Sequence, residues 1–123
     1  MSKSATSVKV FAAYLLLLGL ALVLSPNALL RVFRIAPTGE VWIRVVGMLV
    51  LVLAFYYWSA ARAGLESFFR WSVVARTSVL LFFIAFVVAG LAPPVLILFG
   101  VVDLAGAVWT ALALRAEAGP RAA

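Results

Sequence analysis

The 123-residue chain contains no cysteine and no histidine, and only four of its residues are aspartate or glutamate. Without cysteine it can form neither disulfides nor thiolate-bound iron–sulfur clusters. Without histidine it lacks the commonest general base and the commonest ligand of metals and haem. The sequence also has no glycine-rich nucleotide loop, no GxSxG and no cluster of metal ligands. These absences favour a protein without catalytic activity, cofactor or bound metal.

Charge of either sign is also scarce. Charged residues make up 11% of the chain and hydrophobic residues 67%, whereas a soluble domain is about half apolar and a quarter charged. A domain this short buries only about two thirds of the surface that its unfolded chain exposes. The excess apolar surface must therefore face lipid, and we expect one transmembrane domain over residues 1–123.

Four segments are long enough to cross a bilayer, which takes about 20 apolar residues. The last two share one apolar stretch that Pro93 and Pro94 divide, and Pro94 suits the first turn of a new helix because it has no amide proton. A tight hairpin should join them. The first segment is interpreted as a retained helix and not as a cleaved signal peptide, because Pro26 would follow the cut. The predicted spans are residues 8–24, 41–61, 75–92 and 94–114.

The basic residues predict the orientation. Seven lie on the side of the two termini and three on the opposite side, and cytoplasmic loops carry the excess of lysine and arginine. We therefore predict an all-α, up-down-up-down four-helix bundle in the bacterial cytoplasmic (inner) membrane, with both termini cytoplasmic. Topology also explains the pI of 10.9, so nucleic acid is not an expected partner. The seven residues are Lys3, Lys9, Arg62, Arg70, Arg76, Arg115 and Arg121, and the three are Arg31, Arg34 and Arg44.

Two mixed segments are expected to lie along the membrane surfaces. Residues 64–71 combine phenylalanine and tryptophan with Glu66 and Arg70, and residues 26–35 combine leucine and phenylalanine with Arg31 and Arg34. Amphipathic segments of this kind lie in the interfacial plane. The first is predicted for the inner surface and the second for the outer one.

Charges inside the hydrocarbon are the informative positions, because each is costly unless it is paired. Asp103 lies about 14 Å past Pro94 along the helix axis, close to the midplane. Arg44 and Arg76 are its candidate partners; Arg44 is preferred, with Glu40 one turn before it as a second, exposed carboxylate. Asp103 and Arg44 would either line a polar cavity for a ligand or proton, or form a buried pair that fixes helix register.

Weaker candidates for a polar cavity are Tyr14 and Trp109, together with the hydroxyls of Thr77, Ser78 and Thr110. Such groups commonly satisfy a helix carbonyl or a lipid headgroup. Gly47 and Gly100 are expected at helix contacts, because small residues let helix backbones approach closely in lipid.

The run from Tyr14 to Trp58 resembles the small bacterial DoxX-like membrane proteins. The matching residues are Ser25-Pro26-Asn27, Phe33, Arg44 and Gly47, and the last helix, Val101 to Trp109 (VVDLAGAVW), is also similar. The similarity would cover residues 8 to 115. It implies a four-helix fold and, through the family's name, a link to a membrane subunit of thiosulfate:quinone oxidoreduction. The chain has no cysteine for sulfur chemistry, which places that activity in doubt.

Three functions are therefore considered. The first is an accessory subunit or a binder of a lipid-like small molecule, without catalytic activity. The second is the membrane subunit of a quinone-linked oxidoreductase, and the third is a small transporter that would need a dimer. The expected partners are the lipid bilayer and either another membrane protein or a second copy of the chain.

Overall fold

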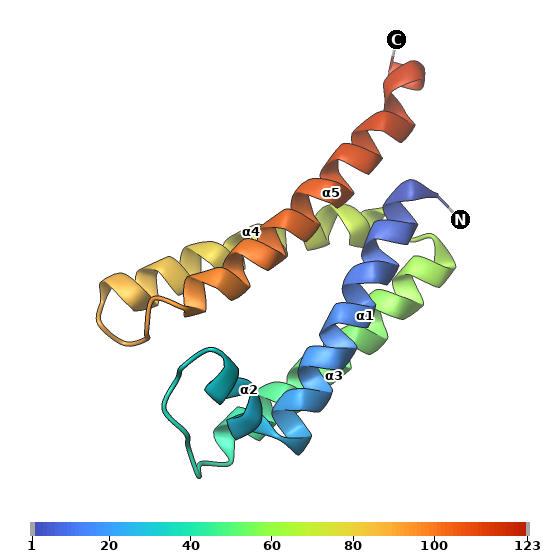
Figure 1. The fold of residues 1–123 in the computed structure, drawn as a ribbon. Coiled ribbons are helices and arrows are strands. Elements are labelled where there is room, and N and C mark those ends of the chain that lie inside the picture. Colours follow the sequence, from blue (N-terminus) through green and yellow to red (C-terminus); the bar gives the residue numbers. More distant parts are fainter. Residues whose placement is uncertain (1, 123) are drawn as a thin grey trace. The chain divides into compact units, whose positions relative to one another are not determined.

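A computed structural model of the protein describes residues 2–122, and within them the chain is all helical. Four helices are long and apolar enough to cross a membrane, which confirms the predicted all-α fold class and indicates a multi-pass membrane protein. Figure 1 shows the five helices, α1 (Lys3–Leu24), α2 (Pro26–Val32), α3 (Trp42–Ala63), α4 (Glu66–Val88) and α5 (Leu96–Ala122).

Helix α1 begins at Lys3, five residues before the predicted start of the first span. The first amides of a helix have no partner within it. Here the Ser2 hydroxyl accepts a hydrogen bond from the amide of Ala5, and the Glu117 carboxylate accepts one from the amide of Ser4. These acceptors let the helix extend beyond its apolar segment.

Helix α4 begins at Glu66, nine residues before the predicted third span. Gly64, with a φ of +65°, separates it from α3, and no proline or glycine interrupts residues 66–88. The carboxylate of Glu66 in the first turn also favours a helix start there. Most of the segment predicted for the inner surface is thus the first part of a long helix, and its surface position stays a prediction.

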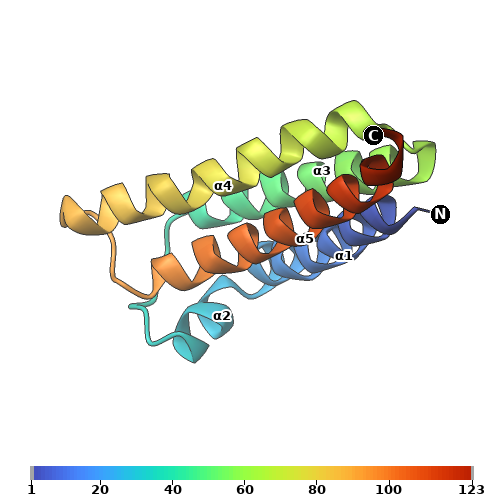
Figure 2. The same cartoon turned by 90° about the horizontal axis from the view of Figure 1, so that it is seen from above.

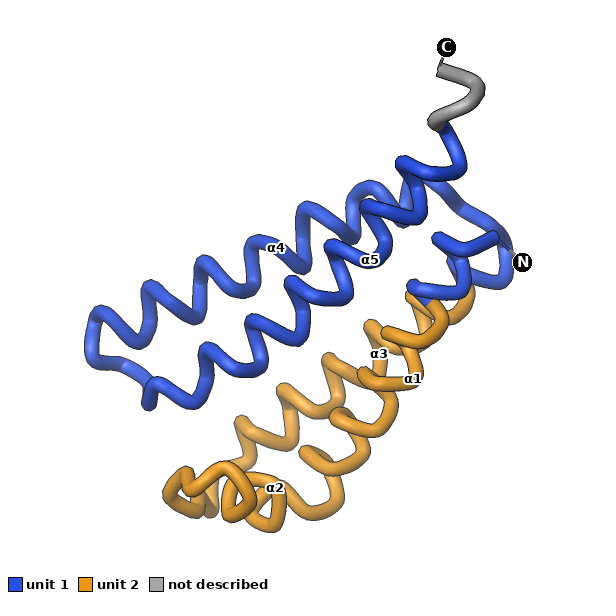
Figure 3. The backbone as a smooth tube through the Cα atoms, turned by 45° about the horizontal axis from the view of Figure 1, so that its top comes forward, with its two compact units in different colours: residues 1–8, 60–123 blue, residues 9–59 orange. Residues whose placement is uncertain are grey.

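The described chain separates into two compact units, coloured differently in Figure 3. Unit 1 consists of residues 1–8 and 60–123, and unit 2 of residues 9–59. Each unit is described by itself. The single transmembrane domain and the cytoplasmic position of the termini stay predictions.

In unit 2, α1 and α3 approach closely at two glycines. A Cβ atom on Gly19 would lie 2.7 Å from Cγ of Leu51, and one on Gly47 would lie 2.9 Å from the backbone nitrogen of Val23. The helix contact predicted for Gly47 is therefore confirmed. The link from α2 to α3 is closed by Asn27, whose amide group donates to the carbonyl of Thr38 (3.1 Å) and accepts from its N–H (2.9 Å).

In unit 1, α4 and α5 form the predicted antiparallel hairpin and lie side by side in Figures 1 and 2. Gly90, with a φ of +77°, follows the end of α4. Pro93 and Pro94 lie in the turn, where their carbonyls accept hydrogen bonds from the first amides of α5. A Cβ atom on Gly100 would lie 2.9 Å from Cα of Leu80, which confirms Gly100 as a contact between these helices.

Candidate functional site

Arg76 is the most buried charged residue of the described chain, with 2% of its surface exposed. Its Nε donates to the carbonyl of Ser72 (3.2 Å), and its Nη2 donates to the Ser72 hydroxyl (3.0 Å). Nη2 also donates to the hydroxyl of Thr110 on α5, at 2.9 Å. The guanidinium therefore joins α4 to α5 through polar contacts.

The chain of hydrogen bonds continues from Thr110 into α1. The Ser7 and Thr110 hydroxyl oxygens are 2.7 Å apart, and the Ser7 hydroxyl donates to the carbonyl of Ser4 at 2.7 Å. A hydroxyl has one proton, so Thr110 is the donor to Ser7. The bonds then run in one direction, from Arg76 through Thr110 and Ser7 to the Ser4 carbonyl. Ser7, Ser72, Arg76 and Thr110 are all buried and are called the polar cluster below.

Asp103 is half-buried and interacts electrostatically with Arg76. It lies seven residues before Thr110, close to two helical turns, so both residues are on one face of α5. From the sequence, Arg44 is the preferred partner of Asp103 and Arg76 the alternative. In unit 1 the charge of Arg76 acts on the Asp103 carboxyl, and a direct pair between them stays a prediction.

Three more of the predicted residues, Arg44, Glu40 and Tyr14, lie in unit 2. The guanidinium of Arg44 is exposed and donates to the carbonyl of Val23, near the end of α1. Glu40 is exposed, and its amide donates to the hydroxyl of Thr38 at 3.2 Å. The ring centroid of Tyr14 is 5.5 Å from that of Phe11. A pair between Arg44 and Asp103 would join the two units and stays a prediction.

Glu117 and Ser4 form a contact that was not predicted from the sequence. One carboxylate oxygen accepts from the amide of Ser4 at 2.9 Å, and the other accepts from its hydroxyl at 2.7 Å. The spacing of these residues in the sequence could have indicated the contact. Ser4 and Ser7 are three residues apart, and Thr110 and Glu117 are seven apart, so each pair shares a helix face. Ser4 and Glu117 are called the clasp below.

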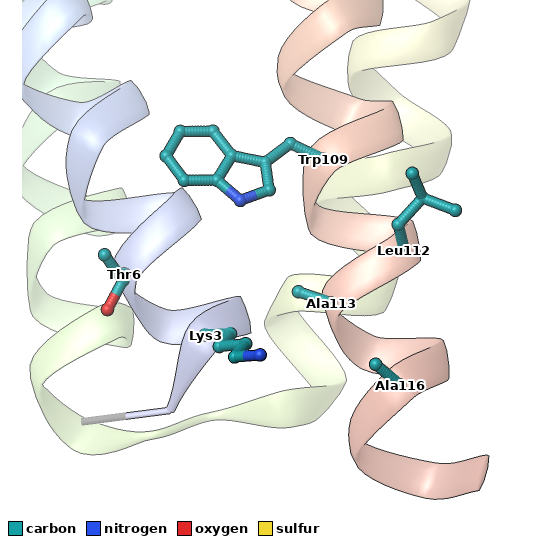
Figure 4. Close-up of a pocket in the computed structure, with 6 residues that line it drawn as sticks. All are labelled: Lys3, Thr6, Trp109, Leu112, Ala113 and Ala116. Carbon is teal, nitrogen blue, oxygen red and sulfur yellow. The ribbon is translucent and has the colours of Figure 1, made fainter.

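A groove lies beside these contacts, between the first turns of α1 and the second half of α5, with a volume of about 350 Å³. Figure 4 shows the indole of Trp109 projecting from α5 toward α1, with Ala113 and Ala116 on the same side of α5. This α1–α5 groove is lined by Lys3, Thr6, Trp109, Leu112, Ala113 and Ala116.

The groove combines two kinds of surface. Lys3 brings an ammonium group, Thr6 a hydroxyl and Trp109 an indole N–H, whereas the remaining lining residues are leucine and alanine. Small-molecule sites are commonly ~300–1,000 Å³ and mostly apolar with a few polar groups. Within residues 2–122 no group of acidic residues could hold a metal ion. The groove therefore places a few polar groups beside a mostly apolar surface.

No protein-family model matches the chain, and neither a curated protein nor a solved structure matches it. Its function therefore has to be inferred from its own residues and their geometry.

Proposed function

We propose that the protein is a non-catalytic membrane protein that binds an acidic, lipid-like molecule in the α1–α5 groove, at the inner surface of the bacterial cytoplasmic membrane. The observation that carries the proposal is the position of the groove. It lies between two helix segments that the clasp and the polar cluster hold together.

The chemistry of the groove supports an acidic head and an apolar tail. The ammonium of Lys3 favours a carboxylate or phosphate, and a hydrogen bond between charged partners is about twice as strong as a neutral one. Leu112 and the alanines offer apolar surface to a chain. Trp109 is 45% exposed, and an indole of this kind prefers the boundary between headgroups and acyl chains.

The polar cluster supports the groove by fixing its walls. Ser7 and Thr110 join α1 to α5 through a buried hydrogen bond, and Ser4 and Glu117 join them again. Binding costs less when the site is already ordered before the ligand arrives. In this proposal Arg76 and Asp103 have a structural role, which was one of the two roles considered for Asp103.

We also propose that the protein is a DoxX-like membrane protein and shares the four-helix fold of that family. A quinone head is neutral, so its carbonyl can accept a hydrogen bond from Lys3 but cannot form an ion pair with it. An acidic amphiphile is therefore the better candidate, and a quinone is the appropriate comparison ligand.

The test is fluorescence quenching of Trp109 by a dibrominated fatty acid, in detergent-solubilised full-length protein in which Trp42, Trp58 and Trp71 are phenylalanine. We expect saturable quenching that unbrominated fatty acid reverses and decylubiquinone does not. Lys3→Gln should weaken binding about tenfold, as expected for losing one charged hydrogen bond. Lys9→Gln is the matched control, because Lys9 is the other lysine of α1 and does not line the groove.

Equal binding by the Lys3→Gln and Lys9→Gln variants would overturn the proposal of an acidic ligand in this groove. Competition by decylubiquinone as effective as that by fatty acid would favour the quinone-linked function instead.

A further inference from the structure

A second groove lies between α4 and α5, with a volume of about 330 Å³. Its rim carries two arginines, one from each helix, and its floor is apolar and half-buried. This α4–α5 groove is lined by Arg70, Val73, Ala111, Leu114, Arg115 and Ala118.

The two grooves lie on opposite faces of α5. Residues 109, 112, 113 and 116 line the first, and residues 111, 114, 115 and 118 line the second. Both sets have the spacing of a single helix face, and they are displaced by two residues, or about 200° around the helix. A ligand in one groove therefore leaves the other open, so the second groove can bind a different ligand.

We propose that the α4–α5 groove binds the headgroup of an acidic phospholipid, with Arg70 and Arg115 holding its phosphate. Arginine suits this role because its planar guanidinium presents paired N–H donors that match two phosphate oxygens. The apolar side chains of Val73 and Leu114 then meet the upper part of the acyl chains. This inference does not depend on the proposed function of the α1–α5 groove.

The positions of the two arginines along their helices fit a headgroup. Arg70 lies four residues after the start of α4 at Glu66, and Arg115 directly follows the apolar run of α5 that ends at Leu114. Both side chains are exposed at the same end of the antiparallel hairpin. Basic residues next to the cytoplasmic leaflet attract its anionic lipids.

Glu66 is the acidic side chain that lies beside Arg70. Its carboxylate is 3.5 Å from Arg70, and both side chains are 59% exposed. An exposed ion pair of this kind contributes little, so a phosphate that also contacts Arg115 competes with it. The apolar floor favours a phospholipid over free phosphate, which would leave that floor without a ligand.

The experiment is native mass spectrometry of the full-length protein released from detergent, with phosphatidylglycerol and phosphatidylcholine of equal chain length as probes. We expect one phosphatidylglycerol to bind about tenfold more tightly than phosphatidylcholine, because both lipids carry the phosphate but the two arginines repel the choline cation of the second. The double variant Arg70→Gln/Arg115→Gln should lose this preference. The double variant Arg31→Gln/Arg62→Gln removes the same charge outside the groove and should retain it.

Three results would overturn the inference. They are equal binding of the two lipids by the wild-type protein, an equal loss in both double variants, and displacement of phosphatidylglycerol by millimolar inorganic phosphate. If the first double variant fails to fold, Ala118→Phe keeps both arginines and fills the groove, and it should also abolish the preference. Retention of the preference in Ala118→Phe would contradict the position of the site.

Discussion

The Nη2 atom of Arg76 donates a hydrogen bond of 2.9 Å to the hydroxyl of Thr110, so a buried cation on α4 depends on a neutral hydroxyl of α5. Ser7 lies 2.7 Å from the same hydroxyl. Thr110 therefore connects three helical segments, α1, α4 and α5.

Replacement of Thr110 by valine should destabilise the protein, because the shape is kept while the hydroxyl between Arg76 and Ser7 is lost. A lost hydrogen bond to a charged group costs about 1.5–3 kcal/mol. The measurement is thermal unfolding in detergent followed by circular dichroism, in which Thr110→Ser should restore most of the loss. Thr77→Val is the control, because the Thr77 hydroxyl bonds the Val73 carbonyl of its own helix. An equal effect in both valine variants would contradict the connecting role of Thr110.

The partner of Asp103 can be identified by two double-mutant cycles. Asp103→Asn combined with Arg76→Met should be non-additive in unfolding free energy by about 1 kcal/mol, since groups that interact directly commonly couple by about 0.5–3 kcal/mol. Asp103→Asn combined with Arg44→Met should be additive. The opposite pattern would support the Arg44 pair inferred from sequence and would argue against Arg76.

Loss of the Glu117 carboxylate should loosen the start of α1. In Glu117→Gln the amide and hydroxyl of Ser4 lose their charged acceptor, so hydrogen exchange over residues 3–8 should become several times faster. Glu66→Gln removes a carboxylate from an exposed ion pair and should leave that exchange unchanged. Unaltered protection in Glu117→Gln would show that the clasp does not hold the segment.

A side chain at Gly47 should destabilise unit 2. A Cβ atom there would lie 2.7 Å from Cβ of Leu22 and 2.9 Å from a backbone nitrogen, so the helices must separate, and overpacking of this kind costs about 1–3 kcal/mol. Gly47→Ala should lower the unfolding temperature despite the better helix propensity of alanine. Gly39→Ala, which meets nothing within 4 Å, is the control. A stabilised Gly47→Ala protein would disprove the close approach.

The sequence predicted the number of spans and the hairpin at Pro93 and Pro94, because long apolar segments and missing amide protons are local properties. It did not predict where α1 begins. The residue that supports its first turn, Glu117, is 113 positions away along the chain, and only the folded helices bring the two together.

Only part of the candidate site could be predicted from the sequence, because its contacts also join residues that are far apart along the chain. Asp103, Arg76 and Trp109 were recognisable as polar or amphipathic residues in an apolar chain. The roles of Ser7 and Thr110 depend on which helices are neighbours, and a serine or threonine in a membrane helix commonly bonds its own helix, as Thr77 and Ser78 do. Neither groove could be inferred before the two faces of α5 were known.

The most direct test of the proposed function fills the α1–α5 groove from an exposed position. Ala116→Phe should abolish binding of the brominated fatty acid to the protein that retains only Trp109, with its helix content and unfolding temperature unchanged. Ala118→Phe, on the opposite face of α5, should bind the fatty acid as tightly as the parent. Unchanged affinity in Ala116→Phe, or equal loss in both variants, would contradict the assignment of this groove as the binding site.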